Sequence, residues 1–326
     1  MALNIHYESK DNIDINTMSN FLLSIIIPVY NEEKNITPLL KRLLPILKPY
    51  NYELIFIDDG SKDKTVGEIK KAVSGNNRLK LISFYRNFGH QMALSAGYET
   101  TLGDCVISLD ADLQDPPDVI PQMIEKWQKG AKIVYGKRDK RDTDSFLKKI
   151  TAQKFYRLIN FLSDIPIPDD VGDYRLLDRE VVNFLNSLHE QSRFLRGLVA
   201  WGGYPASYVY FSRDKRKNGE THYTLSKMIN LALEGITSFS TKPLRVASYF
   251  GFTVAVIGFL GIIYAVLRRI LFPDYVVSGW ATLFIAIMFL GGIQLFTIGI
   301  IGEYIGKIYK EIQQRPKFLI REKINL

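Results

Sequence analysis

Two long apolar runs near the C-terminal end constrain this sequence more than any other feature. Residues 246–267 read VASYFGFTVAVIGFLGIIYAVL, and residues 278–301 read SGWATLFIAIMFLGGIQLFTIGII. Neither run contains Asp, Glu, Lys or Arg, and each exceeds the roughly 20 residues that a helix needs to cross the hydrocarbon core of a bilayer. The sequence therefore predicts two transmembrane helices. The alternative is a pair of buried core helices, but such helices seldom run this long without a charge.

The charges around these runs predict their orientation. The connection RRILFPDYVV is short, so the runs form a hairpin whose outer ends lie on the same side of the membrane. Arg268 and Arg269 lie in this connection, but more basic residues flank the hairpin on its outer side. They are Lys242, Arg245, Lys307, Lys310, Arg315, Lys317, Arg321 and Lys323. Because positive residues favour the cytoplasmic side and no signal peptide is visible, we expect a multi-pass protein of the inner (cytoplasmic) membrane with both termini in the cytoplasm.

Strand-like apolar runs alternate with helical patterns between residues 22 and 136. The strands read LLSIIIPVY, YELIFIDD, LKLISFY, CVISLDA and KIVYG. Continuous apolar strands separated by helices predict an α/β fold of Rossmann-like type, with a mostly parallel sheet covered on both faces. Ligands of such sheets bind beyond the carboxyl ends of the strands. The polar clusters NEE, DDGS, RNFGH, DADLQD and GKR each follow one strand, so we expect them to meet in one site.

Composition limits the chemistry that this site can perform. The chain has one cysteine, Cys105, which excludes an intramolecular disulfide and a cysteine-based zinc site. The four histidines are scattered without metal-ligand spacing, so any metal must be held by oxygen. The net charge of +8 raises the question of a nucleic-acid partner. Because the basic residues flank the apolar runs, bilayer phosphates account for them better, and we expect no nucleic-acid partner.

The segment VISLDADLQDPPDVI gathers four carboxylates at the end of a predicted strand. Asp110 and Asp112, with Gln114, offer the hard oxygen donors that suit Mg²⁺ or Mn²⁺, and Mg²⁺ commonly binds one or two carboxylates together with substrate phosphates. Asp115 and Asp118 fit the start of the next helix, where proline is tolerated in the first turn. A lone D-x-D pair is more often a solvated turn or a helix cap, so the metal hypothesis depends on the neighbouring motifs.

Those motifs resemble a known family. SIIIPVYNEEKNI, IDDGSKDKT, RNFGHQMALSAGYETTLGD, DADLQDPP and GDYRLLDR, in this order, are similar to the GT-A glycosyltransferases of family 2. With the C-terminal hairpin, the chain from Phe21 onward resembles the polyisoprenyl-phosphate glycosyltransferases, the group of dolichyl-phosphate mannose synthase and the bacterial bactoprenol glycosyltransferases. The resemblance implies a metal-dependent, inverting enzyme. It would transfer a hexose or N-acetylhexosamine from a nucleotide sugar, with uridine favoured, to polyprenyl (undecaprenyl) phosphate for cell-envelope glycan modification.

The resemblance also implies roles for individual residues. Asp112, Gln114 and Asp110 would bind Mg²⁺ or Mn²⁺. Asp173, in GDYRLLDR, occupies the position of the catalytic base; a base or orienting role is favoured over a structural salt bridge with Arg175 or Arg179. The residues expected to bind the nucleotide sugar are Pro28, Tyr30, Glu32, Asp58, Asp59, Asp110 and Asp112.

Basic residues are expected at the acceptor and at the diphosphate. Arg138 and Lys148 are the candidates for the acceptor phosphate. Where relatives usually carry lysine, this chain has His90 in RNFGH and His222 in RKNGETHYT, a segment that begins at Arg216. We expect His90, Arg216 and His222 to contact the diphosphate. A histidine provides a full positive charge for this contact only when it is protonated. Alternatively, both histidines lie at the rim of the site and tolerate exchange.

The sequence predicts five segments. They are an N-terminal extension (1–20), a GT-A catalytic domain (21–223), an interfacial helix (224–243), the transmembrane hairpin (244–302) and a basic cytoplasmic tail (303–326). Within the catalytic domain, the basic amphipathic pattern of residues 146–162 predicts a helix that either lies at the membrane interface or packs on the core of the domain.

Two other functions stay open at this point. A membrane polysaccharide synthase of the same fold would carry a Q-x-x-R-W motif, which neither QSRFLRG nor QQRPKF supplies. A non-catalytic membrane scaffold would not need Asp110, Asp112 and Asp173. The nucleotide sugar, the lipid phosphate and the membrane are therefore the expected partners, and the sequence leaves a homo-oligomer open.

Overall fold

The computed structural model describes residues 20–138, 171–212, 237, 240–271 and 279–326. Several predictions fall outside these residues. They concern nearly all of the N-terminal extension, the amphipathic segment 146–162, most of the interfacial segment 224–243, and three site residues: Lys148, Arg216 and His222.

An eight-stranded sheet forms the centre of the N-terminal domain, with the strand order β7-β5-β6-β4-β1-β2-β3-β8. Strand β1 pairs in parallel with β2 and β4, β2 with β3, and β5 with β7. The remaining pairs, β4 with β6, β5 with β6, and β3 with β8, are antiparallel. The mostly parallel α/β fold is thus confirmed. The strands are β1 Leu22–Val29, β2 Asn51–Asp58, β3 Leu79–Phe84, β4 Cys105–Ser108, β5 Ile133–Arg138, β6 Val171–Asp178, β7 Ala206–Phe211 and β8 Ile320–Ile324.

Strand β6 places its first residues where the predicted site lies. It runs antiparallel to both β4 and β5, with Ser108 opposite Arg175. Its N-terminal end therefore lies at the same edge of the sheet as the carboxyl ends of β1 to β5. Asp173, two residues before Arg175, consequently lies just beyond the end of β4, close to the loop that carries Asp110 and Asp112.

Helices cover both faces of the sheet because the central strands are apolar on both sides. Along β1, Ile25 and Ile27 pack on one face and Ile26 on the other, as the alternation of side chains in a strand requires. Helices α1, α2 and α4 cover the first face, and α3, α6 and α7 cover the second. The helices are α1 Ile36–Leu47, α2 Thr65–Val73, α3 His90–Thr100, the 3₁₀ helix η2 Pro117–Val119, α4 Ile120–Gln128, α6 Arg179–Ser187 and α7 Leu195–Trp201.

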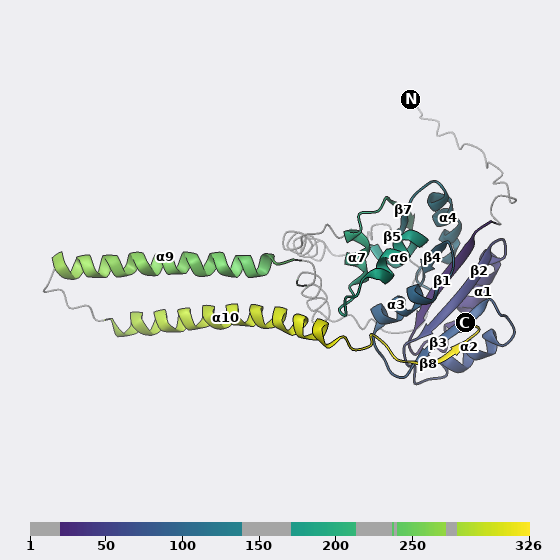
Figure 1. Ribbon diagram of the computed structural model, residues 1–326, viewed down its shortest axis with the longest axis horizontal. Coiled ribbons are helices and arrows are strands. Elements are labelled where there is room, and N and C mark those ends of the chain that lie inside the picture. Colours follow the sequence, from purple (N-terminus) through teal and green to yellow (C-terminus); the bar gives the residue numbers. More distant parts are fainter. Residues whose placement is uncertain (1–19, 139–170, 213–236, 238–239, 272–278) are drawn as a thin grey trace, which may run out of the picture.

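The two apolar runs form long helices, α9 Lys242–Leu271 and α10 Trp280–Gln313. They run side by side away from the sheet (Figure 1). Their apolar side chains are largely exposed, and both helices are long and apolar enough to cross a membrane. Exposed apolar surface of this extent marks an interaction surface, and a bilayer is the solvent that such a hairpin suits.

The structure corrects the predicted basic tail at residues 303–326. Helix α10 continues to Gln313, and Ile320–Ile324 forms β8, which pairs with β3 at the edge of the sheet. The catalytic sheet therefore includes a strand from beyond the hairpin. The sequence IREKI alternates apolar and charged residues over one short strand, so it resembles a polar tail until its distant partner is known.

Candidate active site

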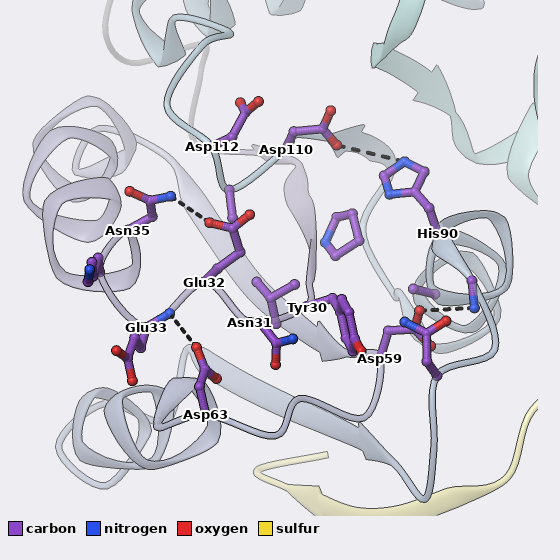
Figure 2. A pocket seen from close by; sticks show the side chains of 17 residues that line it. Tyr30, Asn31, Glu32, Glu33, Asn35, Asp59, Asp63, His90, Asp110 and Asp112 are labelled. Carbon is purple, nitrogen blue, oxygen red and sulfur yellow. Dashed lines mark hydrogen bonds and ion pairs between the residues drawn. The ribbon is translucent and has the colours of Figure 1, made fainter. Parts of the chain in front are cut away.

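Two adjoining cavities lie at the carboxyl edge of the sheet. The first, of about 800 Å³, lies among the segments that follow β1, β2, β3 and β4 (Figure 2). The second, of about 670 Å³, lies between the start of α3, the segment that leads into α7, and the end of α10. Gly89, His90 and Asp110 line both cavities. The predicted convergence of polar clusters at this edge is therefore seen for the clusters that follow the first four strands.

The loop after β1 is held in place by the loop that leads into α2. The backbone N–H of Asn31 donates to Ser61 Oγ at 2.9 Å, and that of Glu32 donates to Thr65 Oγ1 at 2.8 Å. Asn31 in turn accepts from the N–H of Lys62, and its φ of 56° makes the chain turn sharply here. These hydrogen bonds hold in place the part of the loop after β1 that lines the first cavity. Pro28, Tyr30 and Glu32, the predicted nucleotide residues of this loop, all line it.

The adjacent acids Asp58 and Asp59 have different environments. Asp59 lines the first cavity, and its carboxylate accepts from the N–H groups of Phe88 at 2.6 Å and Gly89 at 2.9 Å. Burial raises the pKa of Asp59, and the neighbouring Asp58 raises it further. Asp58 is fully buried and accepts from the N–H of Ser61 and from Ser83 Oγ, so it lies beneath the cavity and supports its loops.

The loop after β4 carries Asp110 and Asp112, which both line the first cavity (Figure 2). Burial raises the pKa of Asp110, His90 partly offsets this effect, and the nearby Asp173 and Asp112 carboxylates raise the pKa further. Asp112 Oδ1 accepts from the N–H of Gln114 at 3.0 Å. The Gln114 side-chain oxygen is buried and has no hydrogen-bond partner among the described residues.

These oxygen donors fit a divalent cation of the Mg²⁺ or Mn²⁺ kind. Two carboxylates and one amide oxygen form an all-oxygen set, and Mg²⁺ usually completes such a set with water and substrate phosphates. In the described parts of the chain, no group of three or more His, Cys, Asp or Glu is placed to hold a metal ion. A resident metal cage is therefore not seen there. Asp110 and Asp112 line the first cavity and agree with an open site that a substrate phosphate completes, whereas Gln114 is buried and is not among the residues lining either cavity.

Asp173 lies among three basic side chains. Arg196 Nη2 lies 2.8 Å from Asp173 Oδ2, and Arg196 Nε donates to Oδ1 at 3.2 Å. His90 Nε2 lies 3.4 Å from Oδ2, and Arg175 Nη2 lies 3.6 Å from Oδ1. Burial alone would raise the pKa of Asp173, but Arg196, His90 and Arg175 together hold it well below its ordinary value. The carboxylate is therefore ionised and engaged at neutral pH.

His90 lies where the two cavities meet. Its Nε2 is 3.7 Å from Asp110 Oδ1, as well as 3.4 Å from Asp173. Burial disfavours the charged imidazole, but the two carboxylates outweigh this effect and raise the pKa of His90 to about 9. The side chain is thus a cation at pH 7. Gly89, immediately before it, has a φ of 99°, a conformation that favours glycine and lets the chain turn into α3.

The second cavity has a basic wall that the sequence did not reveal. Arg193 and Arg196, around the start of α7, and Lys310, in the last turn of α10, line it. Gln91 connects its parts: the side-chain oxygen accepts from the N–H of Leu195 at 3.1 Å, and the side-chain nitrogen lies 3.5 Å from Asp173 Oδ2. In the sequence, QSRFLRG stands out only for failing to supply a Q-x-x-R-W motif, and nothing local links it to Asp173.

The acceptor residues predicted from the sequence are not brought into either cavity by the described structure. Arg138 lies at the end of β5, with Nη2 3.9 Å from Asp115 Oδ1, and it is not among the residues lining the two cavities described above. Lys148 lies outside the described residues, as do Arg216 and His222. Asp118 lies in η2 ahead of α4 and pairs with Arg42 at 2.6 Å, which agrees with its predicted place at a helix start.

The fold, the carboxylate-lined cavity and the apolar hairpin together define a glycosyltransferase of the GT-A type. A family model described as glycosyl transferase family 2 matches residues 24–185, and one described as the GtrB C-terminal hairpin matches residues 242–308. Full-length relatives extend the match over nearly the whole chain. The chain belongs to glycosyl transferase family 2.

Two relatives illustrate the range of names in this group. A bactoprenol glucosyl transferase of Shigella phage SfX is 46% identical, over 92% of this chain and 99% of the relative. An uncharacterized glycosyltransferase of Bacillus subtilis, YkcC, is 45% identical, over 92% of this chain and 93% of the relative. Among solved structures, glucosyl-3-phosphoglycerate synthase of Mycobacterium tuberculosis, in complex with Mn²⁺, UDP-glucose and phosphoglyceric acid, is 19% identical with a TM-score of 0.45, covering 70% of this chain and 83% of that chain.

Proposed function

We propose that this protein transfers one sugar from a nucleotide sugar to polyprenyl phosphate at the cytoplasmic face of the inner membrane. The observation that carries the proposal is the pair of adjoining cavities, one lined by carboxylates and one by basic side chains, which meet at Asp110 and His90. The second cavity includes Lys310 of α10, so it opens beside the apolar hairpin. The names of the bactoprenol glucosyl transferase relatives support a polyprenyl phosphate as the acceptor.

In this proposal the first cavity holds the nucleotide sugar, a UDP-linked hexose or N-acetylhexosamine. Pro28, Tyr30 and Glu32 form one side of the nucleotide pocket, and Asp59 contacts the base while it holds the loop of Gly89. Asp58 acts from beneath, through Ser61 and Ser83. These roles depend on how a nucleotide would lie against the loops after β1 and β2, which the hydrogen bonds described above hold in place.

Asp110, Asp112 and Gln114 would hold a Mg²⁺ or Mn²⁺ ion beside the donor diphosphate. When bound, the ion would neutralise charge on the diphosphate and stabilise its departure. The chain's own residues prepare this place, since the loop after β4 carries two carboxylates that line the same cavity, and a cation beside the partly buried Asp110 would favour its ionised form. His90, whose raised pKa favours the protonated form, lies 3.7 Å from Asp110 and would add positive charge beside the diphosphate from the acceptor side.

The transfer step needs no strong base. An oxygen of the acceptor phosphate attacks C1 of the sugar, the bond from C1 to the diphosphate oxygen breaks, and the nucleoside diphosphate leaves with the bonding electrons. A phosphate monoester has a second pKa of about 6, so at neutral pH the attacking oxygen already carries its charge. Attack opposite the leaving group inverts the configuration at C1 and gives a β-linked phosphodiester from an α-linked donor.

Asp173 then acts as an orienting residue. Its carboxylate is ionised and bonded to Arg196, and a group held this way is a weak proton acceptor. Its function in the proposal is to fix Arg196 and His90 where the two phosphates approach each other. Positioned cations of this kind lower the barrier because they stabilise charge without reorganising during the reaction.

Transfer of radiolabel into lipid tests the function directly. Detergent-purified protein is incubated with undecaprenyl phosphate, Mg²⁺ or Mn²⁺, and a panel of radiolabelled nucleotide sugars, and the label in the organic phase is counted. We expect one donor to label the lipid with a single sugar per phosphate. Absence of lipid label with every donor would refute the proposal, and a product with several sugars would favour a polysaccharide synthase instead.

A further inference from the structure

The last turns of α10 leave the apolar part of the hairpin and reach the second cavity. Charged residues begin at Glu303, after an uncharged stretch that runs from residue 278. Lys310 lines the second cavity, together with Arg193 and Arg196. A helix that is long and apolar enough to cross the membrane therefore also supplies part of the wall beside Asp173.

Glu311, the next residue, joins α10 to the segment that carries this basic wall. Its carboxylate oxygens accept from the backbone N–H of Gln191 at 2.9 and 3.0 Å, and Oε1 also accepts from that of Ser192 at 3.2 Å. Hydrogen bonds from backbone N–H groups to a carboxylate are charge-assisted and stronger than those to a neutral acceptor. Gln191 and Ser192 are thereby bonded to α10.

The contact continues from this segment to Asp173. Gln191 and Ser192 lead into Leu195, whose N–H donates to Gln91, and one residue further Arg196 bonds Asp173. The position of α10 thus determines where the segment before α7 lies, and this segment leads directly to Arg196.

The chain after α10 also makes specific contacts, with β3 and α2. Phe318 stacks on Phe84 with ring centroids 5.0 Å apart, and Arg321 donates to Ser83 Oγ at 2.9 Å. Lys70 pairs with Glu322 across the edge of the sheet. The end of α10 is therefore linked to the segment before α7 through Glu311 and to the sheet through the residues that follow the helix.

We infer that the last turn of α10 forms part of the acceptor site. Lys310 contacts the phosphate of the membrane-anchored acceptor lipid. Glu311 is a positioning residue that holds the segment carrying Arg193 and Arg196 in place. The inference rests on the proposed function. A lipid phosphate is the fitting ligand because its chain remains in the bilayer beside α9 and α10 while its headgroup has to reach Asp173. A wall supplied by the membrane helix itself meets that requirement.

The role of Lys310 is tested by Lys310→Gln, with Lys310→Arg as the conservative variant. We expect Lys310→Gln to raise the KM for undecaprenyl phosphate about tenfold, as for the loss of one charge-assisted hydrogen bond, and Lys310→Arg to restore it. The KM for the nucleotide sugar should not change. Arg315→Gln is the matched control, because it removes the same charge from a residue beyond the helix end and outside the lining of the cavity.

The assay is run in an uncharged detergent and in vesicles that contain phosphatidylglycerol. If Lys310 contacts the acceptor phosphate, the change in KM persists in the uncharged detergent. If Lys310 only contacts anionic headgroups in general, the change appears in the vesicles alone, and that result would overturn its role. A wild-type enzyme that labels no lipid would refute the proposed function, whereas active wild type with an unaltered Lys310→Gln refutes this inference alone.

Glu311→Gln tests the positioning role, since the amide keeps the shape but has only one oxygen to accept from the two N–H groups. We expect a rise in the KM for the lipid of about threefold to tenfold, an unchanged KM for the nucleotide sugar, and partial rescue by Glu311→Asp. Glu303→Gln, on the exposed surface of the same helix, is the control. A purely structural role predicts a lower melting temperature with both KM values unchanged, and this outcome would overturn the inference.

Discussion

Arg196 engages both carboxylate oxygens of Asp173, at 2.8 Å from Oδ2 and 3.2 Å from Oδ1. This two-point contact joins β6 to α7 in the lining of the second cavity, beside His90, which lines both cavities. A carboxylate that binds a guanidinium at two points fixes the plane and direction of that guanidinium. Asp173, in the GDYRLLDR motif, therefore controls the orientation of the Arg196 guanidinium.

The first prediction is that Asp173 and Arg196 act as one unit. Asp173→Asn should lower kcat roughly 100-fold, because it leaves Arg196 and His90 without the charge that positions them. Arg196→Gln should produce a loss of similar size, and the double variant should lose much less than the sum of the two in free energy. The measurement is kcat for the four proteins. Fully additive losses would contradict the coupling, and Arg42→Gln, which breaks a surface pair with Asp118, serves as the control.

The second prediction concerns the positive charge at position 90. His90→Gln keeps the size of a polar side chain but removes the cation that lies between Asp110 and Asp173. We expect kcat/KM at pH 7 to fall roughly 10- to 100-fold, as for the loss of a charge-assisted hydrogen bond of about 1.5–3 kcal/mol. His90→Lys, which restores the charge, should recover most of this loss. Equal activities of the Gln and Lys variants would show that the charge is not used and would favour the rim alternative.

The third prediction concerns the divalent cation. Removal of metal with EDTA should abolish transfer, and addition of Mg²⁺ or Mn²⁺ should restore it, because the diphosphate leaves poorly without charge neutralisation. Asp112→Ala should abolish the metal-dependent rate, whereas Asp118→Ala, in the same acidic segment but paired with Arg42, should retain it. Transfer is measured as label in the lipid phase. Activity retained by Asp112→Ala would remove this residue from the metal site.

Much of the fold could be predicted because its signals are local. The strands that became β1 to β5 are continuous apolar runs, and such runs are typical of a sheet buried on both faces. Strand β6 lacks this signal, since the charged residues Asp173 and Arg175 interrupt its apolar run although both are buried in the folded protein. Strand β8 alternates charged and apolar residues, and its partner β3 lies far away in the sequence.

The same distinction separates the two halves of the site. Asp110, Asp112 and Asp59 lie directly after strands, so the topology of a parallel sheet predicts their convergence. Arg196 and Lys310 lie in helices remote from those strands, and only the tertiary packing of α7 and α10 brings them into the cavity that Asp173 lines. The acceptor residues chosen from the resemblance alone, Arg138 and Lys148, stay a prediction: the first does not line the second cavity, and the second lies outside the described residues.

The fourth prediction concerns the strand beyond the hairpin. Phe318→Ala removes the ring that stacks on Phe84 and should lower the free energy of unfolding by about 1–2 kcal/mol, less than the 3–5 kcal/mol of a fully buried phenylalanine because Phe318 is half-buried. The neighbouring Leu319 has an exposed side chain, so Leu319→Ala should cost less. The melting temperature of the detergent-solubilised protein is the readout. Equal melting temperatures for the two variants would mean that β8 docks without this contact.

The last prediction concerns an ionic network near the amino ends of β1, β2 and β3, at the opposite end of these strands from the active site. Glu53 accepts from Lys80 Nζ at 2.7 Å, from Ser24 Oγ at 2.5 Å and from the N–H of Leu102 at 2.7 Å. Burial raises the pKa of Glu53, but these hydrogen bonds outweigh burial and lower it below its ordinary value of 4.5. The ionised form is therefore favoured in the folded protein. The resulting stability is fully present above pH 4.5 and is lost as the pH falls through the lowered folded value.

Glu53→Gln should consequently destabilise the protein by roughly 3 kcal/mol at pH 7, because it removes a buried carboxylate and leaves the partly buried Lys80 without its charged partner. The difference in melting temperature between the wild type and the variant should shrink as the pH is lowered from 5 toward 3, since protonation removes the same interaction from the wild type. Glu125→Gln, which breaks an exposed pair with Lys129, should shift the melting temperature little at any pH, as is usual for surface salt bridges. A difference between wild type and Glu53→Gln that stays constant over this range would contradict the assignment, because it would mean that the ionised state of Glu53 does not stabilise the fold.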